Sequence, residues 1–413
     1  MSEMIAFLIK LKGNAKPCIL TEPLWGIPVN LYTPFIVLFM YGLGVGDIEI
    51  GIILSVGLAS QVVFAFIGGV VTDKYGRRRT TFIAEFFAWS IPALLWALSQ
   101  NFWWFIAAAI FNGARNITLV SFECLWVDEI NDQSKINTVF NWMLICGLLS
   151  VFFAPIAGYF VQVHGVVPVM RVLYVFAFFS MSAKFTSLYI LCKETDRGRE
   201  RMEATKNTSL FRLLWGYKDV FVQISRSRDM IRALVLLTLE GISLVIILGF
   251  FALFVTQNLG LPEAFLAYFP ILRAGLMLLF MLGIQSRLNR FKPVKVMLAG
   301  LLLYVVAFGW LLAAPVDNWL WIAGFVAMDA CASALFMPRM RGMAAHYIEP
   351  KERARIRSLF HVIVLAISTP FGYLAGRLSD LDRQLPFVLV LAIFVIMVIF
   401  TAVNIRKEPP SYA

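Results

Sequence analysis

The chain has 413 residues, of which 60% are hydrophobic and only 15% are charged, and its mean hydropathy is +0.79. Soluble globular domains carry about a quarter charged residues, so this composition excludes an ordinary soluble protein and indicates one that is solvated mainly by lipid. The net charge of +11 does not indicate nucleic-acid binding, because the cations lie in short loops between apolar segments rather than on one face of a soluble module.

Twelve apolar segments are long enough to span a membrane, which takes about 20 residues in a helix. They are 22–45, 48–71, 80–99, 102–125, 137–163, 168–192, 231–257, 262–285, 294–314, 318–340, 357–378 and 386–405. We therefore expect an all-α membrane protein with twelve transmembrane helices in two pseudo-symmetric six-helix bundles. The bundles would occupy residues 1–192 and 231–413, with a cytoplasmic linker over 193–230.

The N-terminus and the first segment carry few functional signals. Residues 1–16 are amphipathic and basic toward their end, which is typical of a helix on the cytoplasmic leaflet rather than of a cleavable signal peptide. Asn30 and Thr33 share a helix face. They either meet a ligand in a central cavity or only hydrogen-bond between helices. We expect Glu22 at the membrane interface.

The loop between the second and third segments carries a dense cluster of charge. It reads Gly68-Gly69-Val70-Val71-Thr72-Asp73-Lys74-Tyr75-Gly76-Arg77-Arg78-Arg79. Charge is costly in hydrocarbon, so this loop must lie at a membrane surface, and its cations predict the cytoplasmic one. The opposite loops lack Lys and Arg, with Arg383 as the exception. We therefore expect a multi-pass protein of the plasma membrane with both termini in the cytoplasm.

Ionisable residues inside membrane segments are functional candidates by default. Arg115 and Glu123 lie on one face of the fourth segment, about two turns apart. Burial disfavours the charged form of a carboxylate, which makes Glu123 a candidate proton carrier. The alternative is that such charges form buried ion pairs that only orient helices. Lys184 is expected to snorkel toward the cytoplasm, and Glu85 to lie at the interface.

The polar stretch 193–230 separates the two halves. Its first part, 193–208, is dense in charges of both signs and is expected to be a flexible, solvated linker. Its second part places apolar residues at helical spacing over 210–224. This pattern fits an amphipathic helix on the membrane and equally an ordinary solvated helix packed on the loops.

The second half repeats features of the first at a constant spacing. A loop glycine and a Gly-Tyr pair recur at this spacing, and Arg115 and Asp329 are separated by the same number of residues. Duplication of this kind is typical of secondary transporters, which bind substrate at the repeat interface near mid-membrane. The other intramembrane charges of the second half include Glu240 and Arg273.

The loop order G-x-x-x-D-x-x-G-R-R resembles the loop 2–3 signature of the major facilitator superfamily of secondary transporters. Its matching residues are Gly69, Asp73, Gly76, Arg77 and Arg78. The resemblance implies that this motif gates the cytoplasmic side, and that Arg77 pairs with Asp128 after the fourth segment. In the superfamily, segments one, four, seven and ten line the central cavity, which implies that Arg115, Glu240 and Asp329 lie there.

Two shorter motifs resemble those of drug-efflux members of that superfamily. The end of the fourth segment, Ser121–Asp128, is similar to S-G-x-E-A-x-x-x-D, with Phe122 and Cys124 in place of the glycine and the alanine. In the fifth segment, Ala154–Tyr159 is similar to G-P-x-x-G-G, with other residues in place of two glycines.

We therefore expect a secondary active transporter of a small molecule that works by alternating access. Proton-coupled efflux of amphipathic, drug-like compounds by antiport is favoured by the two shorter motifs and an aromatic-rich interior. The alternative, proton-coupled uptake of a small polar or anionic metabolite, is favoured by arginines that can grip a carboxylate or phosphate. The candidates for substrate binding or proton coupling are Arg115, Glu123, Glu240, Arg273, Asp329 and Asn30.

An enzyme is not expected. The three histidines do not lie at metal-ligand spacing with a carboxylate, and there is no P-loop. The five cysteines show no C-x-x-C spacing. We expect no metal and no cofactor, a proton gradient as the driving force, and a small-molecule substrate and the lipid bilayer as partners. Nucleic acid is not an expected partner, and the chain is expected to be a monomer.

Overall fold

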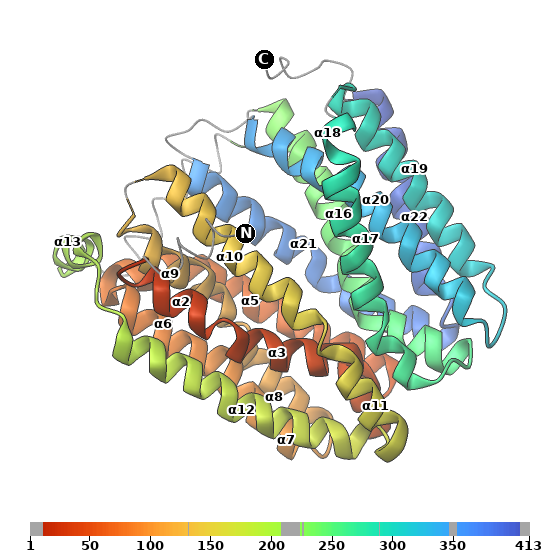
Figure 1. Ribbon diagram of the computed structural model, residues 1–413. Helices are drawn as coiled ribbons and strands as arrows, with labels where there is room; N and C mark the ends of the chain where they lie inside the picture. Colours follow the sequence, from red (N-terminus) through yellow and green to blue (C-terminus); the bar gives the residue numbers. More distant parts are fainter. Residues whose placement is uncertain are drawn as a thin grey trace. The chain divides into compact units, whose positions relative to one another are not determined.

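A computed structural model of the chain describes residues 11–130, 132–207, 224, 227–288, 290–346 and 353–404 (Figure 1). Within these ranges the secondary structure is helical, without a strand. Twelve helical stretches in these ranges are long and apolar enough to cross a membrane: Ala15–Gly42, Asp47–Tyr75, Arg77–Leu98, Phe102–Val127, Lys135–His164, Val166–Leu191, Arg228–Asn258, Glu263–Phe280, Pro293–Leu312, Trp319–Met343, Ser358–Leu381 and Leu385–Asn404. The predicted all-α membrane fold with twelve spanning helices is confirmed.

The largest difference in a boundary is at the first span, which begins at Ala15 rather than at residue 22. Its first helix, α2 (Ala15–Thr21), leads directly into α3 (Pro23–Tyr32). Pro23 lies at the first position of α3, where a missing N–H removes no intrahelical hydrogen bond. A proline that appears to end a helix in the sequence therefore starts one.

The contacts of the chain divide it into two compact units. The first comprises Met1–Ile36, Val56–Phe160 and His164–Gly216, and the second comprises Val37–Ser55, Val161–Val163 and Tyr217–Ala413. The long helix α5 (Asp47–Tyr75) contributes its N-terminal end to the second unit and the remainder to the first. The predicted division at residues 192 and 231 stays a prediction.

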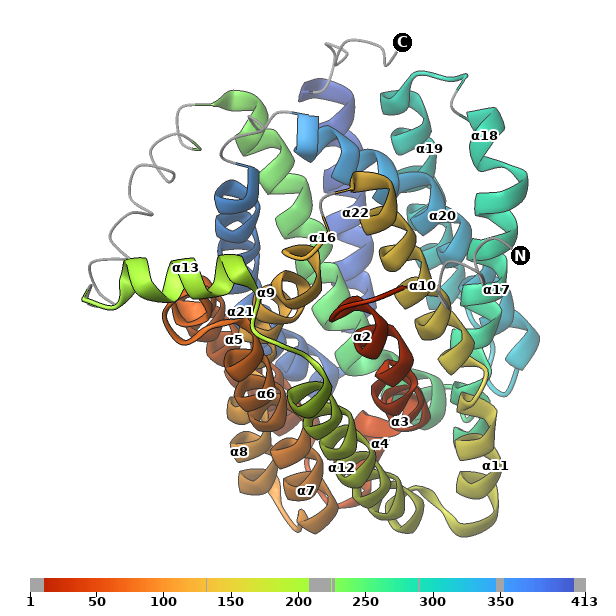
Figure 2. The same cartoon turned by 60° about the vertical axis from the view of Figure 1, so that its left-hand side comes forward.

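In the first unit the 26-residue helix α12 (Val166–Leu191) packs against the ten-residue α3, and the two lie side by side in Figures 1 and 2. The further elements of this unit are α6 (Arg77–Glu85), the π-helical turn η2 (Phe86–Ser90), α7 (Ile91–Leu98), α8 (Phe102–Asn112), α9 (Arg115–Val127), α10 (Gln133–Val151), α11 (Ala154–His164) and α13 (Asp196–Thr205). Large side chains such as Trp126, Tyr174 and Phe185 are buried in it. Apolar side chains also remain exposed on this unit, for example Phe179 and Leu149, as expected where lipid is the solvent.

The second unit contains α4 (Ile36–Gly42) and the helices of the second half of the chain. These are α16 (Arg228–Leu253), the π-helical turn η3 (Phe254–Asn258), the 3-10 helix η4 (Glu263–Ala267), α17 (Phe269–Gly283), α18 (Gln285–Leu288), α19 (Pro293–Leu312), α20 (Trp319–His346), α21 (Arg353–Leu381) and α22 (Leu385–Asn404). The indoles of Trp310 and Trp321 stack with ring centroids 3.9 Å apart. Each indole N–H donates to the backbone carbonyl of the other residue, at 3.0 and 2.8 Å.

Part of the predicted flexible linker is a helix, so that prediction was wrong over Asp196–Thr205. Thr195 caps it by accepting a hydrogen bond from the Gly198 N–H at 2.9 Å. The charges that suggested disorder pair within the helix, as Arg199 and Asp196 do. The predicted amphipathic helix over 210–224 lies outside the described residues apart from Ile224, and so does most of the predicted interfacial helix over 1–16.

Candidate functional site

Most of the predicted charged loop is helical, and only one of its residues lies between the two helices. Helix α5 ends at Tyr75, α6 begins at Arg77, and Gly76 between them has a φ of 85°. A residue other than glycine is strained at this φ. A Cβ on Gly76 would also lie 2.5 Å from Glu194 Oε2 and 2.8 Å from Met202 Sδ. The glycine permits both the turn and the close approach of α13.

Arg77 is buried and holds three acceptors at once. Its Nε donates to Asp128 Oδ2 at 3.1 Å, and its Nη1 donates to Asp73 Oδ1 at 2.9 Å and to the Thr72 carbonyl at 3.3 Å. The Asp128 side chain is only 6% exposed. The expected contact of Arg77 with Asp128 is therefore present, and Asp73 joins it. Whether this contact acts as a gate stays a prediction.

Glu194 caps the N-terminus of α6. Its two carboxylate oxygens accept hydrogen bonds from the backbone N–H groups of Arg77 at 2.9 Å and of Arg78 at 3.0 Å. The first N–H groups of a helix have no partner inside the helix, and the positive end of the helix dipole favours an anion there. The sequence reasoning missed Glu194 because it comes from a segment more than a hundred residues away.

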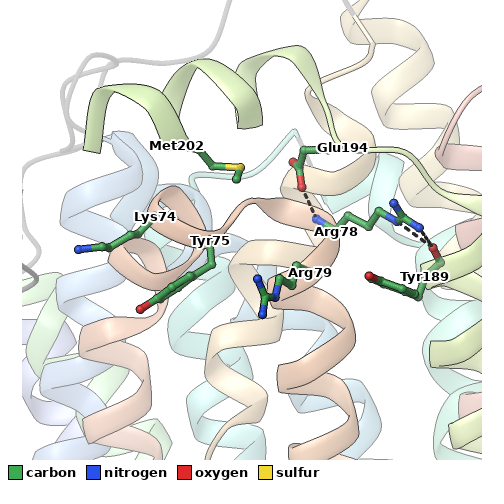
Figure 3. A pocket seen from close by; sticks show the side chains of 7 residues that line it. All are labelled: Lys74, Tyr75, Arg78, Arg79, Tyr189, Glu194 and Met202. Carbon is green, nitrogen blue, oxygen red and sulfur yellow. Dashed lines mark hydrogen bonds between the residues drawn. The ribbon is translucent and has the colours of Figure 1, made fainter. Parts of the chain in front are cut away.

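Helix α13 is tied across the same loop at both of its ends. The Thr195 hydroxyl donates to Asp128 Oδ2 at 3.2 Å, and the Thr205 hydroxyl contacts the Asp73 carbonyl at 3.3 Å. Figure 3 shows α13 above the loop, with Met202 pointing toward it. The loop motif is thus fixed by the segment that follows the sixth span.

A hollow lies between α13, α12 and the loop (Figure 3). It is lined by Lys74, Tyr75, Arg78, Arg79, Tyr189, Glu194 and Met202. The Arg78 guanidinium lies 4.3 Å from the centroid of the Tyr189 ring and donates to the Tyr189 carbonyl. Arg78 of the predicted motif therefore holds α12, whereas Arg77 holds α9 and α5.

Gly69, the first glycine of the predicted motif, lies inside α5 and is half-buried. The glycine at the close helix crossing is its neighbour. A Cβ on Gly68 would come within 3.2 Å of Ile117 Cα and 3.3 Å of the Asn116 carbonyl oxygen, both on α9.

The intramembrane charges of the second unit come together. Arg273 Nε donates to Asp329 Oδ2 at 2.8 Å, which joins α17 to α20. Glu240 on α16 interacts electrostatically with Arg273 and with Arg341. Arg273 and Asp329 thus form an ion pair and Glu240 lies within electrostatic reach of Arg273; these three predicted site residues are called the charged cluster below.

The predicted site residues of the first unit do not form such a cluster. Arg115 begins α9 after the break at Gly113-Ala114, and its Nη2 donates to Gln61 Oε1 at 2.8 Å. Glu123 is exposed on the same helix. Asn30 donates to the carbonyl of Gly26 in its own helix at 2.8 Å, a hydrogen bond within one helix rather than the predicted one between helices.

Two buried charges of the first unit, Lys184 and Glu85, correct the sequence-based predictions. Lys184 does not snorkel, because its side chain is 4% exposed and its ammonium donates to Glu22 Oε2 at 2.8 Å. Glu85, which was expected at the interface, is 6% exposed and interacts electrostatically with both Lys184 and Glu22. The Lys184–Glu22 ion pair joins spans six and one, and Glu85 on span three interacts with both only electrostatically, which no local pattern reveals.

Arg383 is the exception among the loops that otherwise lack Lys and Arg, and a second group of charges accounts for it. Arg383, in the second unit, pairs with Asp47 at 3.3 Å and lies 5.2 Å from the ring centroid of Tyr41. Asp47 also accepts a hydrogen bond from Ser379. Hydrogen bonds to Asp47 and Tyr41 outweigh burial and raise the pKa of Arg383. The charge is therefore locally compensated.

The described residues contain no group of three or more His, Cys, Asp or Glu side chains that could hold a metal ion. Their five cysteines are free thiols.

Comparison of the sequence with known proteins gives two findings. The family model of the Major Facilitator Superfamily matches residues 26–288. The multi-drug resistance efflux pump PmrA of Streptococcus pneumoniae serotype 4 is 31% identical over 109 residues, which are 25% of this chain and 27% of that protein. The match to that pump thus spans about a quarter of its length.

Solved transporters share the fold at low identity. The crystal structure of the nucleoside transporter NupG has a TM-score of 0.74 at 16% identity, covering 96% of this chain and all (100%) of the other. The peptide transporter POT in complex with sulfate has a TM-score of 0.72 at 14% identity, covering 95% and 94%. The xylose transporter XylE from E. coli has 0.67 at 11%, covering 97% of each chain.

Proposed function

This chain belongs to the Major Facilitator Superfamily of transporters, and on that premise we propose that it exports amphipathic, drug-like compounds in exchange for protons. Such transporters alternate the access of one site between the two membrane faces. The observation that carries the proposal is the cluster of Glu240, Arg273 and Asp329 in the second unit. A cationic compound can compete for these carboxylates with a proton, which is the minimum requirement for exchange.

Two further observations support export. The partial likeness to the efflux pump PmrA concerns a protein whose name states that activity. The described interior is also rich in aromatic contacts, such as those of Phe251 with Phe269 and Phe325. Aromatic faces attract organic cations and apolar rings without requiring one specific shape.

The charged loop is proposed to act as a latch on the cytoplasmic side of the plasma membrane. Arg77 binds Asp73 and Asp128 there, and α13 is fastened over them. Interfaces that must open and re-form use charged and polar contacts rather than a large apolar seam. The orientation follows from the cations of this loop.

Uptake of a small anion is the second candidate, and one observation favours it. Among the described residues, the Arg115 guanidinium donates a hydrogen bond to the neutral Gln61, and no carboxylate forms an ion pair with it. A guanidinium without a carboxylate partner can bind a carboxylate or phosphate ligand in a two-pronged manner.

Transport by inside-out and right-side-out vesicles tests both candidates. We expect inside-out vesicles with an acidic lumen to accumulate a fluorescent amphipathic cation, and a protonophore to abolish the accumulation. Asp329→Asn should lower this rate by about tenfold or more, because it removes a carboxylate for which the proton and the cation compete; a tenfold loss corresponds to roughly 1.4 kcal/mol. The matched control is Asp196→Asn, whose side chain is 91% exposed and should leave the rate unchanged.

Accumulation of a radiolabelled organic anion in right-side-out vesicles, abolished by Arg115→Ala, would contradict the export proposal and establish the second candidate. Equal rates for Asp329→Asn and Asp196→Asn would remove the charged cluster from the mechanism.

A further inference from the structure

The first unit holds a buried group of charges that the proposed export site does not use. Lys184 on α12 pairs with Glu22, at the junction of α2 and α3, at a distance of 2.8 Å. Its ammonium also lies 5.6 Å from the ring centroid of Trp25 and 5.1 Å from that of Phe122. Aromatic faces and a carboxylate thus enclose one cation.

Glu85 is the member of this group without a partner of its own. It is 6% exposed, and no hydrogen bond or ion pair of its carboxylate occurs among the described residues. It still interacts electrostatically with Lys184 and with Glu22. A buried, unpaired carboxylate is far more costly in its charged form than in its neutral form.

The charge of the group is therefore unbalanced by one. The single ammonium of Lys184 is already paired with Glu22, and it acts on the second carboxylate, that of Glu85, only electrostatically. One bound proton makes the group neutral, and its loss leaves a buried net negative charge. The π-helical turn η2 begins at Phe86, directly after Glu85, and turns of this kind are frequent at functional sites.

The helices around Glu85 bring few competing charges. The elements packed against α6 are α9, α12 and η2. Their titratable side chains are Arg115, Glu123 and Cys124 on α9, and Arg171, Tyr174, Lys184 and Tyr189 on α12. Of all these, Lys184 is the one that acts electrostatically on Glu85, together with Glu22. Glu22 in turn acts electrostatically on the thiols of Cys18 and Cys146.

We infer that Glu85, Glu22 and Lys184 form a proton-binding site inside the first unit. Water delivers the proton and an O–H bond forms on the Glu85 carboxylate. When that bond breaks, the proton returns to water and the Lys184 ammonium is shared between the two carboxylates. The role of this site as the coupling site rests on the proposed proton-driven transport, whereas the site itself does not.

Infrared difference spectroscopy of the purified protein between mildly alkaline and mildly acidic pH tests the site without transport. The wild type should show the carbonyl band of protonated, buried carboxylic acids, and Glu85→Gln should lose the part of this band that one carboxylic acid contributes. Lys184→Met leaves two buried carboxylates without a cation, so this part should increase about twofold. The exposed Glu203→Gln is the control and should keep the wild-type band.

A Glu85→Gln variant that keeps the full band, or a Lys184→Met variant without the increase, would overturn the inference. If Glu85→Gln does not fold, Glu85→Asp carries the same test, because its band must shift in frequency at unchanged amplitude. Loss of this part of the band together with unchanged proton-driven export would overturn only the coupling role. A wild-type band in a protein without any proton-driven export would support the site and contradict the proposed function.

Discussion

Arg77 organises the charged loop because one guanidinium reaches acceptors on two helices. Its donors contact Asp128 after α9 and Asp73 and Thr72 near the end of α5. The planar fork of an arginine suits such a divided task, which the single point charge of a lysine does not. The contact with Asp128 was predicted from the family resemblance, whereas Asp73 was predicted only as a residue of the motif. The Thr72 carbonyl was not predicted, since backbone acceptors leave no trace in a sequence.

We expect Asp128→Asn to lower the free energy of unfolding by about 1–3 kcal/mol. The substitution removes a buried charge that accepts from both Arg77 and Thr195, while Arg77 keeps Asp73. Thermal unfolding of the purified protein in detergent measures the loss. Asp196→Asn, an exposed pair member, should change stability by less than about 1 kcal/mol. Equal stability of the two variants would contradict the role given to Asp128.

The buried charges show where residue-level prediction stops. Asp73, Arg77 and Asp128 could be assigned because a motif orders them along the chain. Glu22, Glu85 and Lys184 could not, since their burial depends on how three separate spans pack. The sequence shows only how far a charge lies from the end of its span. For Lys184 that distance led to the wrong prediction that the side chain reaches the membrane surface.

At the scale of elements, the N-terminus of α6 depends on a residue from another part of the chain. Glu194 accepts from the N–H groups of Arg77 and Arg78, although it follows α12. A carboxylate at this position contributes both hydrogen bonds and a favourable interaction with the helix dipole.

We expect Glu194→Ala to destabilise the start of α6 by about 0.5–2 kcal/mol. Hydrogen exchange at the amides of Arg77 and Arg78 should become faster by a corresponding factor, because both lose their acceptor. Glu203→Ala on the exposed face of α13 is the matched control. Unchanged exchange at these two amides in Glu194→Ala would show that the cap does not protect them.

The N-terminal end of α5 crosses α21 with backbone close to backbone. A Cβ on Gly376 would lie 2.7 Å from the Asp47 carbonyl oxygen and 3.0 Å from Gly51 Cα. These atoms belong to helical backbone and cannot move aside as a flexible side chain can. The glycines at this crossing are therefore a packing requirement.

We expect Gly376→Ala to lower stability by about 1–3 kcal/mol through overpacking. Gly275→Ala is the control, because a Cβ there has no atom within 4 Å. That substitution should leave stability unchanged or raise it by up to about 1 kcal/mol, since alanine favours a helix over glycine. Thermal unfolding compares the two, and a smaller loss for Gly376→Ala than for Gly275→Ala would contradict the close crossing.

At the scale of the whole molecule, the twelve spans were the most predictable feature. Length and hydropathy suffice for a spanning helix, because every backbone polar group must be satisfied within it. Helix breaks inside spans were less visible, such as the one between α8 and α9 at Gly113-Ala114. The helix α13 was missed because its stability comes from a cap and from contacts with the loop, not from an apolar face.

The predicted orientation of the spans can be tested by labelling single cysteines. In a variant without the native cysteines, Gln100→Cys should react with a membrane-impermeant maleimide in intact cells. Arg79→Cys should react only after the membrane is opened. Both residues are exposed, so the reagent can reach either thiol from its own side. Labelling of Arg79→Cys in intact cells would reverse the orientation derived from the loop cations.

The paired tryptophans of the second unit have a consequence for assembly. Each indole donates to the backbone of the opposite residue, so the contact requires one particular alignment of α19 with α20. A slip by one residue along either helix loses both hydrogen bonds and the ring stack together, at a cost of about 2 kcal/mol. The two tryptophans thus fix the register between α19 and α20. They can be aligned as a hairpin by these two side chains before the rest of the bundle has formed.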